Sequence, residues 1–127
     1  MSDPMGFQYV VLRCVPRVDR EEFVNVGVML YCQKADYLRA ACHVDRERLG
    51  ALSPAVDLEA VDSALRVVEA VCRGDDSAGE AGRKPLGSRF GYLTAPRSTV
   101  IQTSAVHGGV TADPAGELEH LVKTLVH

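Results

Sequence analysis

The chain has 127 residues, of which 46% are hydrophobic and 24% charged, and its formal net charge is −3. This length fits one domain with a single core spanning residues 1–127, and the composition excludes an intrinsically disordered protein. The acidic balance argues against a protein that coats nucleic acid. No apolar stretch reaches about 18 residues and the N-terminus has no signal-peptide pattern, so we expect a cytoplasmic protein without a membrane segment.

Three strands are predicted in the first third of the chain. Residues 7–15 are rich in β-branched and aromatic residues and end at Pro16. Residues 24–32 alternate with the period of two typical of a half-buried strand. Residues 37–44 follow a short polar link that suits a hairpin. In the second strand the alternation places Val24, Val26, Val28, Leu30 and Cys32 on one face and Asn25, Gly27, Met29 and Tyr31 on the other.

The middle of the chain contains one clear helix. Apolar residues recur at helical spacing between Leu58 and Cys72, with Asp57 suited to the N-cap and Gly74 to the C-terminal end. A shorter helix could precede it over residues 45–52. Residues 74–88 carry several glycines and no periodic apolar face, which predicts a mobile loop.

Two further strands and a helix complete the predicted fold. Residues 90–93 and 99–106 have strand composition and are separated by a turn at Pro96. Asp113 and Pro114 are typical of the first positions of a helix. The order of elements predicts an α+β fold, in which a mainly antiparallel sheet of about five strands has the two main helices packed on one face.

The distribution of charge indicates where a ligand or partner would bind. Residues 81–112 contain no Asp or Glu and four Lys or Arg, whereas the rest of the chain has ten basic and seventeen acidic residues, a balance of −7. Such a basic window attracts an anionic ligand or an acidic protein surface. Arg97 and Ser98, after Pro96, either hold a phosphate or carboxylate or form a solvated turn. Arg89 is either a second anion contact or one half of a weak surface ion pair.

His107 and Ser104 are the candidates for catalysis. An imidazole titrates near neutral pH, so His107 could act as a general base toward Ser104 or a substrate hydroxyl. The alternative is a histidine that closes the turn before Gly108. Spacing in the sequence assigns neither an orienting carboxylate nor an oxyanion hole to this pair.

A second group of polar residues lies on the first two predicted strands. Asn25 either faces solvent or points into a cleft, and Gly27 would leave space beside it on the same face. Arg13 could form a buried ion pair with Glu22. These three polar residues are candidate ligand or partner contacts, and a structural role is the alternative for each.

The sequence gives no basis for a metal or cofactor. Cys14, Cys32, Cys42 and Cys72 are widely separated, and neither a CxxC nor an HxxxH pair is present. No glycine-rich phosphate motif lies between a strand and a helix. We therefore expect free thiols, no metal site and no cofactor.

Several motifs resemble those of a bacterial protein family. The segments at residues 9–13 and 22–28, and the longer one from Arg89 to Gly109 with its Ser-x-Val-His pattern, are similar to the small proteins catalogued as domain of unknown function 3037. The resemblance supplies no biochemical activity. It implies a HipA-like kinase as a partner, because genes for such proteins often stand beside genes for these kinases, the class that contains bacterial persistence toxins.

Two functions remain open on the sequence. The first is a non-catalytic interaction module that uses the basic strand-turn-strand surface to bind a HipA-like kinase or another protein, with a homodimer as a further possibility. The second is a small enzyme or binding protein for a phosphorylated or nucleotide-like ligand, with Arg97 as the anion contact and His107 as the acid or base. Binding of single-stranded nucleic acid through Arg89 and the neighbouring aromatic rings is a weaker third hypothesis.

Overall fold

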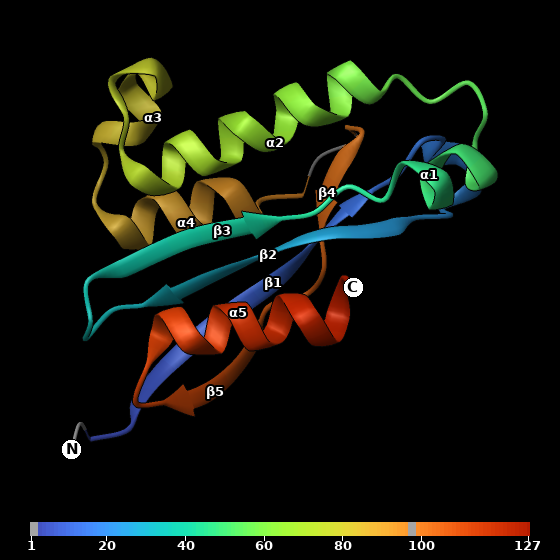
Figure 1. Ribbon diagram of the computed structural model, residues 1–127. Helices are drawn as coiled ribbons and strands as arrows, with labels where there is room; N and C mark the ends of the chain where they lie inside the picture. The colour runs from blue at the N-terminus through green and yellow to red at the C-terminus, as the bar shows by residue number, and fades with distance from the viewer. Residues whose placement is uncertain (1–2, 97–98) are drawn as a thin grey trace.

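The computed structural model describes residues 3–96 and 99–127 (Figure 1). Five strands, five α-helices and two short 3₁₀ segments are found in these residues. In chain order they are β1 (Met5–Cys14), η1 (Val18–Arg20), β2 (Val24–Cys32), β3 (Tyr37–Cys42), α1 (Arg46–Leu52), α2 (Leu58–Arg73), η2 (Asp76–Ala78), α3 (Glu80–Arg83), α4 (Leu86–Thr94), β4 (Ile101–Thr103), β5 (His107–Thr111) and α5 (Pro114–Leu125). The predicted α+β class and the antiparallel sheet are confirmed.

Strand β1 lies inside the sheet and has neighbours on both sides. The order is β3-β2-β1, and β4 and β5 then share the remaining edge of β1. β5 pairs with residues 5–9 of β1, and β4 pairs with residues 12–14. The two short strands therefore follow one another along the same edge.

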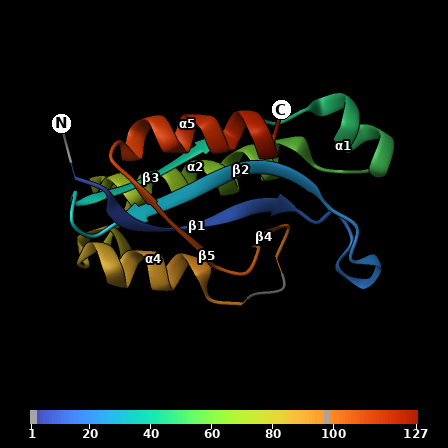
Figure 2. The same cartoon turned by 90° about the horizontal axis from the view of Figure 1, so that it is seen from below.

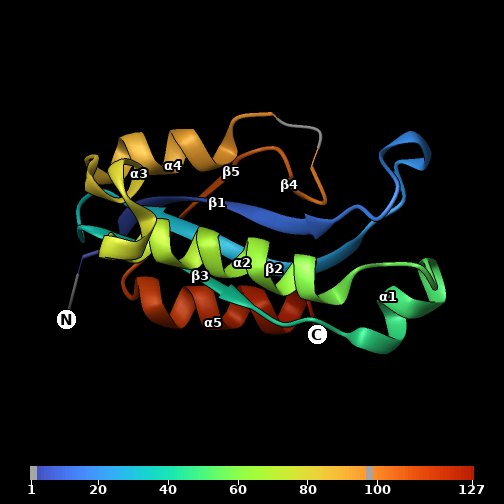
Figure 3. The ribbon, with the colours of Figure 1, turned by 90° about the horizontal axis from the view of Figure 1, so that it is seen from above.

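Helices cover both faces of this sheet. Figure 1 and Figure 2 show α2 and α4 on one side of the strands and α5 on the other. Side chains from α2 and α4, such as Leu65 and Phe90, pack in one core cluster, whereas Leu118 and Val122 of α5 pack in a second. The expectation that both main helices share one face is therefore wrong. The view in Figure 3 shows α4 and α5 on opposite sides of β1 and β2.

A β-bulge in β2 explains how that strand supplies both cores. Leu12 of β1 pairs with Gly27, but Arg13 pairs with Asn25, so Val26 is an extra residue in the ladder. Val24 and Val26 consequently face the α2 side together with Met29, whereas Val28, Leu30 and Cys32 face α5. The simple alternation predicted for this strand is wrong because the bulge reverses the faces after Val26.

Residues 86–94 form a helix and not the predicted strand over 90–93. Leu86, Phe90 and Leu93 stand at spacings of four and three residues, so in a helix they share one face, which packs on the sheet. The short apolar run around Phe90 fits a strand equally well by composition, and tertiary packing decides between the two.

The region between α2 and α4 is more structured than the predicted loop. Residues 74–88 contain η2, α3 and the start of α4. Gly74 ends α2 in the left-handed conformation, with φ of 73°.

The predicted N-caps are confirmed, because Asp57 and Asp113 each accept a hydrogen bond from a backbone N–H in the first turn of their helices. In the described part of the chain, every helix is too short or too polar to cross a bilayer.

Candidate functional site

Arg89 is used inside the fold and does not reach out to an anion. Its Nη1 donates to the carbonyl oxygens of Val71 and Cys72, at 3.1 and 2.9 Å, and its Nε donates to the carbonyl of Lys84 at 2.8 Å. A cation at the end of α2 also interacts favourably with the helix dipole. Arg89 therefore caps α2 and connects it to the start of α4.

The other two residues of the predicted anion site, Arg97 and Ser98, lie outside the described residues. Their proposed contact with phosphate or carboxylate stays a prediction. The predicted strand-turn-strand surface around them has a different form, because residues 86–94 form a helix and β4 has only three residues.

Ser104 has a structural role. The side chain is 7% exposed, and its Oγ accepts a hydrogen bond from the N–H of Val11 at 2.9 Å and donates to the carbonyl of Ala105 at 2.9 Å. Ser104 also donates its own N–H to the carbonyl of Val11. Ser104 thus satisfies the backbone N–H and carbonyl groups of Val11 in β1, in the gap between the end of β4 and the start of β5. The predicted strand over 99–106 is interrupted at this point.

His107 stands apart from Ser104 in its contacts. It is the first residue of β5, is exposed, and its ring lies 5.2 Å from that of Tyr9 between centroids. No hydrogen bond joins the imidazole to Ser104 among the contacts of these described side chains. The hydroxyl of Ser104 is engaged with the backbone of Val11 and Ala105 instead.

Arg13 and Asn25 are brought together, whereas Glu22 is not. Arg13 and Asn25 are paired across β1 and β2, and Gln102 of β4 pairs with Arg13 from the other side. The amide of Asn25 donates to the carbonyl of Leu125 at the end of α5, at 3.0 Å. Glu22 forms an exposed ion pair with Arg20, so the predicted pair between Arg13 and Glu22 does not form.

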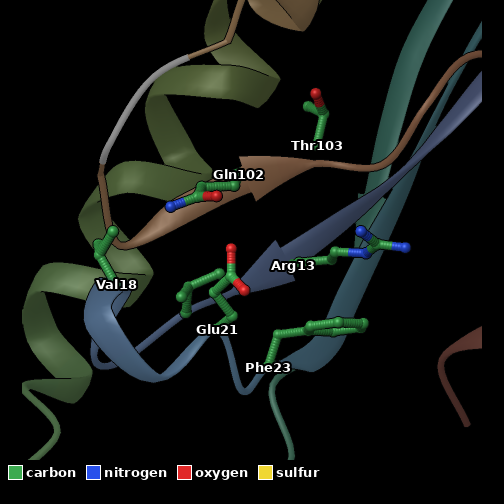
Figure 4. A pocket seen from close by; sticks show the side chains of 7 residues that line it. Arg13, Val18, Glu21, Phe23, Gln102 and Thr103 are labelled. Atoms are coloured by element: carbon green, nitrogen blue, oxygen red, sulfur yellow. The ribbon is translucent and has the colours of Figure 1, made fainter.

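Arg13 stacks on the ring of Phe23 and lines a cleft of about 270 Å³ (Figure 4). The guanidinium carbon lies 4.2 Å from the centroid of the ring. The cleft, called the Arg13 cleft below, is lined by Arg13, Val15, Val18, Glu21, Phe23, Gln102 and Thr103. Its two charged groups, Arg13 and Glu21, come from β1 and from the residue after η1.

Strand β4 borders two more clefts. One, of about 240 Å³, is mainly apolar and lies between α2, α4 and β4, with Val67 and Tyr92 on its walls. The other, of about 350 Å³, is lined by residues 94–96 and 102–106. Gln102 and Thr103 line all three clefts, so this short strand is their common wall.

The four cysteines are free, and three of them are poor nucleophiles. Burial raises the pKa of Cys14 to about 11, and it raises the pKa of Cys42 and Cys72 to about 12. The carboxylate of Glu69 contributes to the effect at Cys42. Since the thiolate is the reactive form, these thiols are not catalytic groups at neutral pH. In residues 3–96 and 99–127, no three His, Cys, Asp or Glu side chains gather in a way that could hold a metal ion.

Sequence reasoning found Arg13 but missed the residues around it. Phe23, Gln102 and Thr103 lie in the segments that carry the family resemblance, but nothing in those segments indicates a shared site with Arg13. They meet Glu21 and Arg13 because β4 pairs with β1 and η1 returns the chain to the same end of the sheet. The sequence shows that Glu21 and Phe23 flank Glu22. It does not show which of these residues lines a cleft with Arg13, because that depends on the left-handed backbone conformation at Glu21.

Comparison with known proteins places the chain in one family. A family model described as protein of unknown function (DUF3037) matches residues 9–126, nearly the whole chain. No curated protein and no solved structure matches the chain significantly. The match covers most of β1, the whole first core cluster, all of the second cluster except Met5 and Phe7, and all residues of the Arg13 cleft. The chain therefore belongs to the DUF3037 family of proteins of unknown function.

Proposed function

We propose that the protein is a non-catalytic interaction module that binds a partner protein along the β4–β5 edge of its sheet. The observation that carries the proposal is the exposed edge strand β5. Within the described residues β5 pairs only with β1, so its outer backbone groups have no strand beside them. An edge of this kind can accept a strand from another chain.

The composition of β5 supports binding at this edge. Natural edge strands usually carry charges or proline that prevent unwanted pairing, yet the five residues from His107 to Thr111 include no Lys, Arg, Asp, Glu or Pro. Val110 in β5 is 70% exposed, and Val106 just before the strand is 45% exposed. A partner strand could pair with this edge and cover both valines, and its flanking side chains could enter the clefts along β4.

The absence of an assembled catalytic group among the described residues favours binding over chemistry. Ser104 is engaged with the backbone of β1, and the imidazole of His107 lies tilted against the ring of Tyr9. Arg89, one of the basic residues that the sequence indicated in this region, donates to carbonyl groups at the end of α2. These contacts support a structural use for residues that could otherwise have served an active site.

The partner we propose is a HipA-like kinase, as the family resemblance implies. The charge distribution is compatible with a partner whose docking segment is extended and mainly uncharged, because β5 offers backbone groups and apolar side chains. A second copy of this chain is the competing occupant of the same edge.

The proposal is tested with a charge placed in the edge strand. Val110→Glu should leave the fold intact, because the side chain is largely exposed, and it should weaken the complex by placing a carboxylate where the partner's strand would lie. Thr124→Glu adds the same charge on the exposed part of α5 and serves as the control. Tagged proteins purified from the native host at moderate salt would be compared by mass spectrometry and by binding to the purified kinase.

A stoichiometric kinase complex that survives Thr124→Glu and is lost with Val110→Glu would support the proposal. Equal binding by both variants would contradict it, since the edge would then not be the docking surface. If sedimentation velocity shows a dimer of the wild type that Val110→Glu dissociates, the edge belongs to a second copy and the kinase assignment is wrong.

A further inference from the structure

We propose that the Arg13 cleft is a binding site for a small zwitterion, a molecule of amino-acid type that carries one carboxylate and one ammonium group beside an aliphatic side chain. The site is separate from the β5 edge, and its occupancy does not depend on the proposed interaction with a partner. The inference rests on the two charged groups of the cleft, on its apolar lining and on its volume.

Arg13 is a guanidinium held ready for an acceptor. Its Nε is buried and has no hydrogen-bond partner among the described residues, although a buried N–H without an acceptor is costly. The guanidinium carbon lies over the ring of Phe23, 4.2 Å from its centroid. A planar guanidinium presents paired N–H donors that match the two oxygens of a carboxylate.

Glu21 supplies the opposite charge from a strained backbone position. Its φ of 55° lies in the left-handed region, which is uncommon for a residue other than glycine and often marks a functional position. Figure 4 shows its carboxylate directed into the cleft between Arg13 and Gln102. No ion pair joins it to Arg13 or to any other side chain in residues 3–96 and 99–127, so the carboxylate is available to an ammonium group.

The two charges together select the ligand. A guanidinium alone would favour any anion, but a carboxylate in the same cleft repels a doubly charged phosphate and attracts a cation. A molecule with one charge of each sign satisfies both groups. Gln102 and Thr103 add neutral polar groups, while Val15 and Val18 offer an apolar wall for an aliphatic side chain. A volume of about 270 Å³ limits the ligand to the size of a single amino acid.

The ligand class is tested by titrating the ¹⁵N-labelled protein with four probes and following the backbone amide signals. The probes are L-leucine, 4-methylpentanoate, which lacks the ammonium group, 3-methylbutylamine, which lacks the carboxylate, and inorganic phosphate. We expect saturable shifts with L-leucine at millimolar concentration, centred on residues of the cleft, and about tenfold weaker binding of each probe that has lost one charge, the effect of about 1.4 kcal/mol for one charged contact.

Three variants separate the proposal from nonspecific binding. Arg13→Lys keeps the charge but removes the fork, and Glu21→Gln removes the acceptor charge; each should weaken L-leucine about tenfold. Glu21→Gln should also abolish the preference for L-leucine over 4-methylpentanoate. Glu119→Gln, on the exposed part of α5, removes the same charge elsewhere and should leave binding unchanged.

A separate measurement covers the case in which a variant of Arg13 does not fold. Glu21→Gly should raise the melting temperature, because glycine adopts the left-handed conformation without strain, and it should still lose L-leucine. The proposal is overturned if L-leucine gives no saturable shifts, if phosphate binds more tightly, or if Glu119→Gln weakens binding as much as Glu21→Gln. Failure of kinase binding in the test of the β5 edge would leave these outcomes unaffected.

Discussion

Arg89 Nη1 donates to the carbonyl oxygens of two consecutive residues, and the nearer of them is that of Cys72, at 2.9 Å. Carbonyl groups in the last turn of a helix have no partner within the helix. Replacing Arg89 by Met should therefore lower the free energy of unfolding by about 1–3 kcal/mol, since two carbonyls and the end of the helix dipole lose a charged donor. Urea denaturation would measure the change.

Arg83→Met is the matched control for this prediction. Arg83 lies in the same basic window but its side chain is largely exposed, and its contact with Glu80 is long, at 3.9 Å. Its loss should change the free energy of unfolding by less than about 1 kcal/mol. Equal effects of the two substitutions would show that Arg89 does not cap α2.

Ser104→Ala should destabilise the fold although the change removes only one oxygen. The N–H of Val11 would then be buried without an acceptor, which costs about 1–3 kcal/mol. His107→Ala, at an exposed position three residues later, should stay within about 0.5 kcal/mol of the wild type. Thermal unfolding of both variants checks the expectation, and a larger effect at His107 would contradict the structural role assigned to Ser104.

Two glycine-to-alanine substitutions should have opposite signs. A Cβ at Gly27 would stand 2.9 Å from the carbonyl oxygen of Ala41 and 3.1 Å from Leu12 Cδ1, so Gly27→Ala should cost about 1–3 kcal/mol. A Cβ at Gly91 in α4 has open space around it, so Gly91→Ala should stabilise the protein by about 0.5–1 kcal/mol. Denaturant titrations of the pair would give both values. A neutral Gly27→Ala would mean that β2 and β3 can separate locally.

The buried thiols predict a loss of stability in alkaline solution. The pKa of Cys42 and Cys72 is about 12 in the folded protein against an ordinary value of 9.0. Above pH 9 the unfolded chain releases these protons while the folded chain keeps them, so the unfolded state binds fewer protons and stability falls as the pH rises from about 9 toward 12. Below pH 9 these groups should leave stability unchanged. Denaturation midpoints measured from pH 8 to 11 test the sign, and the slope should shrink in Cys42→Ala.

The individual elements could be predicted wherever the local pattern agreed with the tertiary structure. The starts of the helix capped by Asp57 and of the helix that begins at Pro114 could be predicted, because an N-cap aspartate and a proline in the first turn favour a helix start through local interactions alone. The helix around Phe90 could not be distinguished from a strand, because a four-residue apolar run is compatible with either. The bulge at Val26 left no local mark, since valine suits both faces of a sheet that helices cover on both sides.

The site could be predicted only in part, for a related reason. Arg13 was visible as a charge on an apolar strand, but its neighbours Gln102 and Asn25 are fixed by the order of the strands, which the sequence does not encode locally. The excess of positive charge in residues 81–112 indicated Arg89, whose guanidinium donates to carbonyl groups at the end of a helix. The net charge of a segment does not show which of its basic side chains already donate hydrogen bonds to backbone carbonyl groups within the fold.

The extra residue in β2 makes strand length a determinant of this fold. Deleting Val26 would restore a regular ladder, and it would turn every side chain on one side of that point toward the wrong helix layer. Among members of the family, a one-residue gap at this position would thus signal a rearranged core, whereas many substitutions elsewhere in the strand would leave the architecture unchanged.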